Sequence, residues 1–177
     1  MEKKEITPEL LDVLDCNGIP TGKIHVRGTG AVPGEYTGAV VVCVINSRGE
    51  MLIQQRVQEK QSWGGLWDVS CGGAICQGET PQIAAMREIK EELGLEIHLD
   101  QVRPSIVTLF SNGFSYTFVV KQEPALESLV LQREEVQDVR YATAEEIKDL
   151  IEKEEFVPYR TSWIDYVFDF ARQEFVF

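Results

Sequence analysis

The hydrophobic and polar residues of the chain follow two periods, one typical of strands and one typical of helices. Residues 38–45 (GAVVVCVI) and 51–57 (MLIQQRV) are apolar runs on either side of a polar turn at residues 46–50. Such runs predict two buried strands joined by the turn. Further short segments predict strands over residues 96–99, 105–110, 114–121 and 136–141.

The first 35 residues predict an N-terminal hairpin. Asn17-Gly18 is a strong signal for a two-residue turn, and it lies between short alternating segments. A short helix over residues 8–14 is the alternative.

A central helix is predicted from Pro81 to Leu93 because both of its ends carry end signals. Thr80 is a natural N-cap, Pro81 suits the first helical position, and Gly94 can take a positive φ after the last turn. Apolar residues three or four positions apart are expected to face a core. These are Ile83, Met86, Ile89 and Leu93.

Two more helices are predicted toward the C-terminus. Thr143 and Glu146 form a capping box that opens a helix running to about Lys153. Residues 161–173 carry aromatic and aliphatic side chains at helical spacing, which predicts an amphipathic terminal helix. This helix packs either on its own domain or on a second subunit, so a homodimer is an open alternative.

The central helix carries three glutamates, Glu88, Glu91 and Glu92, on one patch of its surface. Like charges at this spacing repel, so the patch weakens the helix unless a cation lies among them. Carboxylate oxygens suit Mg²⁺ or Mn²⁺, which take their remaining ligands from water and substrate phosphates. Arg87 is able to pair with Glu79 or Glu91. The alternative is a solvated acidic helix face.

The segment from Gly73 to Leu95 resembles the Nudix box. Gly73, Glu79, Arg87-Glu88, Glu91-Glu92 and Gly94 stand at the specified spacings, and the apolar positions also agree. At average residue usage, chance agreement of the seven fixed positions is on the order of 10⁻⁸. The resemblance implies an α/β/α sandwich with a mixed β-sheet, in which residues 72–95 form a loop-helix-loop. It also implies a hydrolase that cleaves a nucleoside diphosphate linked to another group with Mg²⁺ or Mn²⁺.

Site residues follow from the resemblance by position. Glu88, Glu91 and Glu92 are expected to bind metal, with one glutamate also acting as a base, while Arg87 and Glu79 orient them. Glu135, with Glu134 as second choice, is expected to supply a further metal ligand from before the last strand. The expected substrate-binding residues are Arg56, Trp63 and Gly73.

Two of these assignments have structural alternatives. Arg56 is equally able to form a surface ion pair with an acid such as Glu59. Trp63 and Trp67 flank the loop before the box, where an exposed ring would stack on a ligand, although Trp67 is expected to pack beneath the sheet.

Composition narrows the partners of the protein. The net charge of −12 and the pI near 4.6 argue against broad binding to nucleic acid, and a small diphosphate substrate is favoured instead. No apolar run is long enough to span a bilayer, and the first residues lack a signal-peptide core, so a cytoplasmic protein is expected. The four cysteines are expected to be free thiols.

Residues 1–177 are read as a single domain, with residues 1–35 as an N-terminal hairpin extension and residues 160–177 as a C-terminal helix.

The sequence is also similar to the branch of the family that contains isopentenyl-diphosphate isomerases. That similarity implies an alternative activity, because those enzymes use a cysteine and a histidine two residues apart in the loop after the tryptophan. Here Gly72 and Ala74 occupy these positions, and the chain has only two histidines. Hydrolysis is therefore favoured over isomerisation. A catalytically idle domain that senses a metabolite is a third hypothesis, and the group attached to the diphosphate stays open.

Overall fold

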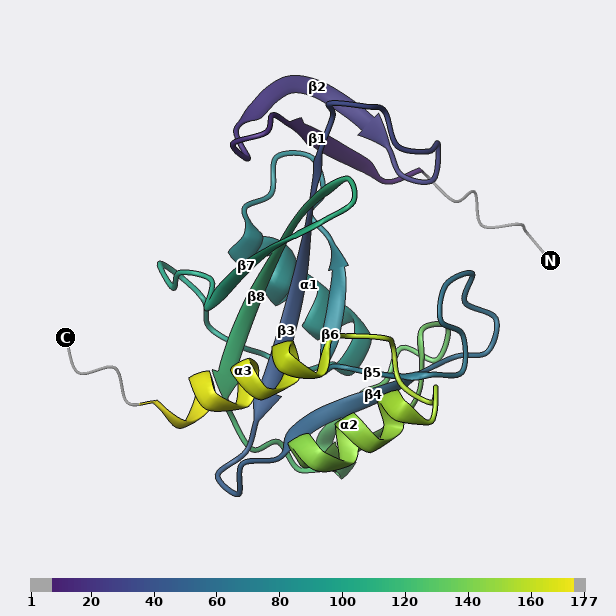
Figure 1. The fold of residues 1–177 in the computed structure, drawn as a ribbon, viewed down its shortest axis with the longest axis vertical. Helices are drawn as coiled ribbons and strands as arrows, with labels where there is room; N and C mark the ends of the chain where they lie inside the picture. Colours follow the sequence, from purple (N-terminus) through teal and green to yellow (C-terminus); the bar gives the residue numbers. More distant parts are fainter. Residues whose placement is uncertain (1–7, 174–177) are drawn as a thin grey trace.

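A mixed β-sheet with helices on both faces forms the body of the protein (Figure 1). The computed structural model describes residues 8–173. The strands are β1 (Leu10–Leu14), β2 (Pro20–Val26), β3 (Thr37–Ile45), β4 (Met51–Arg56), β5 (Trp67–Asp68), β6 (Cys71–Ala74), β7 (Ile106–Phe110), β8 (Gly113–Lys121) and β9 (Val136–Ala142). The helices are α1 (Pro81–Leu93), the short 3₁₀ helix η1 (Leu126–Ser128), α2 (Ala144–Glu152) and α3 (Thr161–Arg172).

The main sheet has two arms that join where β3 turns into β4. In the first arm β3 pairs with the parallel strand β8 along one edge and with the antiparallel strand β6 along the other, and β7 lies outside β8. In the second arm β4 pairs antiparallel with both β5 and β9. The arms share only the Ile45–Met51 pair of β3 and β4. Buried Ser70 links them further, since its hydroxyl accepts a bond from the Val44 N–H and donates one to the Leu52 carbonyl.

The sheet separates two hydrophobic cores. Side chains alternate across a strand, so Val40, Val42 and Val44 pack beneath α1, while Val41, Cys43 and Ile45 pack beneath α2 and α3. Helix α3 buries Ile164, Val167, Phe168 and Ala171 in the second core. Of the two placements open for the terminal helix, the structure therefore shows packing on its own chain. The expected α/β/α sandwich with a mixed sheet is confirmed.

The N-terminal hairpin is also confirmed, and the alternative helix over residues 8–14 is wrong. Strands β1 and β2 pair antiparallel as a separate two-stranded sheet that caps one end of the molecule in Figure 1. The connection is longer than the two residues expected from Asn17-Gly18. The Asp15 carboxylate accepts bonds from the N–H groups of Asn17 and Ile19, which closes a five-residue turn in which Gly18 has φ 77°.

One predicted strand is wrong, and two strands were missed. Residues 96–99 are extended but form no strand, because they run past α1 without a pairing partner among the described residues. Two short strands, β5 and β6, had not been predicted. The remaining predicted strands and helices lie within two residues of their expected bounds, except the terminal helix. That helix was expected over residues 160–177 and ends at Arg172, and residues 174–177 lie outside the described part of the chain. Within residues 8–173, no helix is both long and apolar enough to cross a membrane.

Candidate active site

Both ends of helix α1 have the caps that its sequence predicts. The Thr80 hydroxyl accepts a bond from the Ile83 N–H at 3.3 Å, and Gly94 has φ 65° as its N–H donates to the Lys90 carbonyl. The expected core face is wrong at one position, because Ile83 is 48% exposed. Ala84 and Ala85 are buried instead, and their small side chains allow α1 to lie close to the sheet.

Gly73 on β6 makes room for Glu88. A Cβ atom added to Gly73 would overlap the Glu88 carboxylate, whereas one added to Gly72 would make only ordinary contact with the Val40 carbonyl at 3.4 Å. Gly73 was expected to contact substrate. The structure shows that its missing side chain lets a box glutamate approach the backbone of the sheet.

Glu92 is the most deeply buried glutamate of the box. It is 7% exposed, and its Oε2 atom accepts a bond from the Gln54 side-chain amide at 2.8 Å. Burial raises the pKa of Glu92 to about 7, and the Gln54 bond lowers the pKa only in part. Burial also raises the pKa of Glu88. Two neighbouring carboxylates therefore lie in a setting that disfavours their ionised forms.

Arg87 forms ion pairs with three carboxylates, those of Glu79, Glu88 and Glu91. Its guanidinium donates two bonds to the Glu79 carboxylate, at 2.7 and 2.9 Å, and one to the Ala74 carbonyl. It also forms ion pairs with Glu88 at 2.9 Å and with Glu91 at 3.2 Å. The bonds from Arg87 keep the pKa of Glu79 below its ordinary value. Both pairings expected for Arg87 are therefore present together.

The carboxylate oxygens of this site suit a hard divalent ion, although the side chains are not grouped around one position as metal ligands are. No three acidic, histidine or cysteine side chains within residues 8–173 are grouped as a metal site. Arg87 draws Glu88 and Glu91 toward its guanidinium, while Glu92 is bonded to Gln54. The Oε1 atom of Gln54 is buried without a hydrogen-bond partner in the described part of the chain. Buried carboxylates beside an unpartnered amide oxygen favour a nearby cation.

Glu135 is not grouped with the box glutamates. The structure pairs its carboxylate with Lys60 of the loop between β4 and β5. Burial lowers the pKa of Lys60, and the charges of Glu92 and Glu88 act on the pKa in the opposite direction. Lys60 thus lies within electrostatic reach of the box. Sequence reasoning had missed it.

A cleft of about 630 Å³ opens next to the box, and the three predicted substrate-binding residues Arg56, Trp63 and Gly73 all line it. Arg56 forms its ion pair with Asp68 at 3.3 Å, rather than with Glu59. Trp63 lines the cleft and is 52% exposed. Trp67 packs into the second core as expected, and the Arg140 guanidinium lies 5.0 Å from its ring centre.

The other walls of the cleft come from distant parts of the chain. The N-terminal hairpin and the segment after it supply His25 and Arg27, and the β7–β8 turn region supplies Phe110 and Asn112. Only the fold brings these residues to the box, so no local sequence signal marks them. With Arg27, Arg56 and Lys60, the site has three cationic side chains near its carboxylates.

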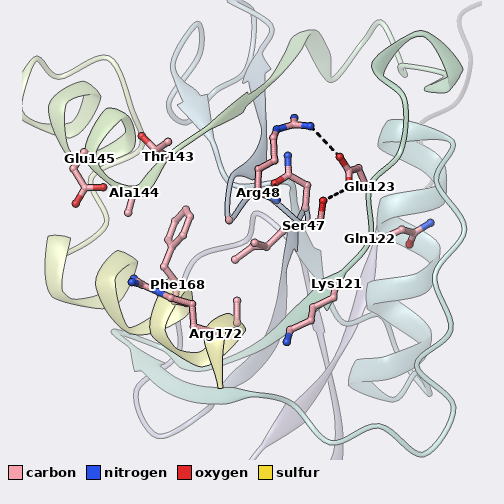
Figure 2. Close-up of a pocket in the computed structure, with 14 residues that line it drawn as sticks. Ser47, Arg48, Lys121, Gln122, Glu123, Thr143, Ala144, Glu145, Phe168 and Arg172 are labelled. Atoms are coloured by element: carbon pink, nitrogen blue, oxygen red, sulfur yellow. Dashed lines mark hydrogen bonds and ion pairs between the residues drawn. The ribbon is translucent and has the colours of Figure 1, made fainter. Parts of the chain in front are cut away.

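A second cavity, of about 720 Å³, lies at the opposite end of β3 and contains none of the predicted site residues (Figure 2). Ser47 and Arg48 on its rim are bonded to Glu123, and Phe168 of α3 points into it. Arg48 is further paired with Glu50, and Arg172 with Asp169. Because the predicted substrate-binding residues line the cleft beside the box and not this cavity, the cleft is the better candidate for chemistry.

The fold and the box define a class of enzyme that comparisons with known proteins identify. A family model described as NUDIX domain matches residues 35–167. An uncharacterised Nudix hydrolase of Listeria monocytogenes is 41% identical over 84% of this chain and 88% of its own length. The crystal structure of the Deinococcus radiodurans protein DR0079 superposes with a TM-score of 0.74 at 22% identity, covering 93% of this chain and all of that one. The chain belongs to the Nudix family and is a Nudix hydrolase, a class that acts on nucleoside diphosphate derivatives and generally uses divalent metals.

The similarity to the isomerase branch is also confirmed. An isopentenyl-diphosphate Delta-isomerase of Streptomyces avermitilis is 29% identical over 92% of this chain and 83% of its own length. In the present structure Cys71 is buried in the first core, and burial raises the pKa of its thiol, while Gly72 and Ala74 line the cleft. The cleft wall therefore lacks the cysteine and histidine that the isomerase pattern places there.

Proposed function

We propose that this chain is a divalent-metal-dependent hydrolase that cleaves the diphosphate linkage of a nucleoside diphosphate derivative or a related small molecule. The observation that carries the proposal is the pair of carboxylates of Glu92, which is buried, and Glu88, which is partly buried. Burial raises the pKa of both, and they lie beside a cleft with cationic walls. A site that combines these charges suits a ligand made of metal ions and phosphates.

The residues of the box have different proposed roles in this reaction. Glu88, Glu91 and Glu92 would hold Mg²⁺ or Mn²⁺, which supplies charge neutralisation and acidifies bound water. Glu79 holds the Arg87 guanidinium, which in this structure is the counter-charge of Glu88 and Glu91. One of these glutamates would also accept the proton of the attacking water.

The cleft binds the substrate. Arg56 is a planar cation suited to phosphate oxygens, and Arg27 and Lys60 add positive charge on the same side. The exposed face of Trp63 suits the stacking of a base or another flat group attached to the diphosphate. We propose Glu135 as a ligand of a second metal ion, in which role it would exchange its partner Lys60 for the ion.

Turnover of a substrate panel tests the proposal. The protein is incubated with Mg²⁺ or Mn²⁺ and with nucleotide sugars, dinucleotides, nucleoside triphosphates and isopentenyl diphosphate. Released phosphate species and isomer products are both measured. The double variant Glu91→Gln/Glu92→Gln is expected to lose most turnover and to keep its fold, since charge is removed and volume is not. Glu152→Gln/Glu154→Gln is the matched control, because it removes two exposed carboxylates outside the cleft.

The same panel separates the alternatives. Unchanged turnover in the Glu91→Gln/Glu92→Gln variant would refute the site assignment. An isomer of isopentenyl diphosphate as product would favour the isomerase activity, and tight binding without any cleavage would favour the sensor.

A further inference from the structure

Strand β7 forms an outer edge of the main sheet. Its inner edge pairs with β8 from Ile106↔Thr117 to Phe110↔Gly113. No strand among residues 8–173 pairs with its outer edge. An antiparallel pair uses only alternate backbone groups of each strand, so the edge presents unpaired N–H and C=O groups to solvent.

The sequence around this edge carries no charge. Residues 104–120 are seventeen positions without one Asp, Glu, Lys or Arg, although charged residues make up 26% of the chain. At that average, about four would be expected in a stretch of this length. Natural sheet edges are commonly protected from pairing by lysine, proline or a bulge within the strand. The register of β7 with β8 is regular, and neither lysine nor proline occurs within it.

Apolar side chains are exposed along the same strand. Val107 and Leu109 share one face because they are two residues apart, and they are 53% and 76% exposed. Large hydrophobic residues are exposed at twelve described positions, and four of these lie within residues 102–110. The edge therefore offers apolar contact area as well as backbone hydrogen bonds.

We propose that β7 is the interface for a second copy of this chain, with the two β7 strands antiparallel across a two-fold axis. An edge strand is complementary to itself in this arrangement, because each copy offers the same row of donors and acceptors. Each copy carries a net charge of −12, so the repulsion between two copies is weakest where they meet through surfaces that lack carboxylates. The edge at β7 is such a surface, because residues 104–120 contain no charged side chain. It also has no charged side chain that could pair with a strongly charged partner.

This interface would lie next to the active-site cleft. Phe110 at the end of β7 and Asn112 in the following turn line the cleft, and Phe110 is 40% exposed. A second copy on β7 would therefore border the side of the cleft that these residues form. The inference does not depend on which diphosphate is the substrate.

Sedimentation velocity tests the interface. The protein is expected to sediment as a dimer of twice 20.0 kDa, and the variant Leu109→Lys as a monomer. Leu109 is already 76% exposed, so a lysine there costs the monomer little burial. Val107→Lys/Leu109→Lys is the stronger version. Val130→Lys is the matched control, because Val130 is 72% exposed outside the sheet, and this variant is expected to remain dimeric.

Hydrogen exchange identifies the strand involved. In the parent, outward-facing β7 amides are expected to exchange more slowly as protein concentration rises, and this dependence is expected to vanish in Leu109→Lys. The central β8 amides, which already pair on both sides, serve as the internal reference. A parent that is monomeric at all concentrations, or a Val107→Lys/Leu109→Lys variant that still dimerises, would overturn the proposal. So would a dimer whose β7 amides show no such dependence.

Discussion

At the scale of single residues, the site is a balance between burial and charge. Glu92 is buried and accepts a hydrogen bond from Gln54. Arg87 forms ion pairs with Glu79, Glu88 and Glu91. Burial of a carboxylate without full compensation raises its pKa and costs stability. This arrangement costs stability in the metal-free protein, as expected if the site binds a cation as we propose.

Replacing Gly73 by alanine is expected to damage the site more than the fold. Its Cβ would displace the end of the flexible Glu88 side chain, and the backbone need not move. We expect turnover and Mn²⁺ affinity to fall by about 10-fold or more, in the range seen when groups that support metal ligands are lost. Gly72→Ala is the matched control, because its Cβ has room. Steady-state kinetics and Mn²⁺ titration compare them, and equal behaviour of the two variants would contradict the role of Gly73.

The raised pKa of Glu92 predicts a pH dependence of stability. The pKa is about 7 in the folded protein against an ordinary value of 4.5, so between these pH values the folded state holds a proton that the unfolded chain has released. In the absence of metal, the free energy of unfolding should therefore decrease as pH rises through this window, by about 3 kcal/mol for this group. Burial raises the pKa of Glu88 and of Asp68, which adds to the same trend.

Urea unfolding with a chelator at about pH 5 and about pH 7.5 measures this dependence. Glu92→Gln cannot titrate, so its free energy of unfolding should change less between the two conditions than that of the parent. Glu91→Gln is the control, since the Glu91 side chain is 54% exposed. An identical change in the parent and in Glu92→Gln would show that Glu92 does not hold the proton.

At the scale of secondary structure, the sequence predicts best where end signals are local. Helix α1 has its expected bounds because Thr80, Pro81 and Gly94 act within one turn of its ends. Strand β6 went unpredicted because two of its four residues are glycines and its pairing with β3 is set by the fold. The pairing of Arg87 with Glu91 was predictable from their i,i+4 spacing on one helix. The positions of Arg27 and Lys60 were not, because they depend on how separate elements meet.

The C-terminal cap of α1 gives a prediction at this scale. Gly94 has φ 65°, and a Cβ there would lie 2.8 Å from the Cβ of Val130 in the loop before β9. Gly94→Ala is therefore expected to cost about 2 kcal/mol, from both backbone strain and this contact. Gly78→Ala isolates the backbone part, since Gly78 has φ 78° and open space around it. Thermal unfolding should show the larger loss for Gly94→Ala, and an equal loss in both would show that the Val130 contact is relieved at no cost.

At the scale of the whole molecule, the two arms of the sheet and the N-terminal hairpin assemble one cleft. The family model covers residues 35–167, whereas His25 and Arg27 come from residues that precede this range. Family resemblance thus predicted the box and the architecture, but not the wall supplied by the hairpin. The overall charge of −12 opposes the approach of a phosphorylated ligand, and the cations of the cleft and the proposed metal ions would offset this charge locally.

Metal binding should therefore stabilise the whole fold. A ligand that binds only the folded state at about 100 times its Kd adds about 2.7 kcal/mol, which for a domain of this size corresponds to a rise in Tm of about 5–10 °C. We expect Mg²⁺ or Mn²⁺ to raise the Tm in calorimetry and a chelator to reverse the rise. Glu91→Gln/Glu92→Gln should lose this response, whereas Glu152→Gln/Glu154→Gln should keep it. If both double variants respond like the parent, the ions act through general screening of the acidic surface, and the box glutamates do not bind them.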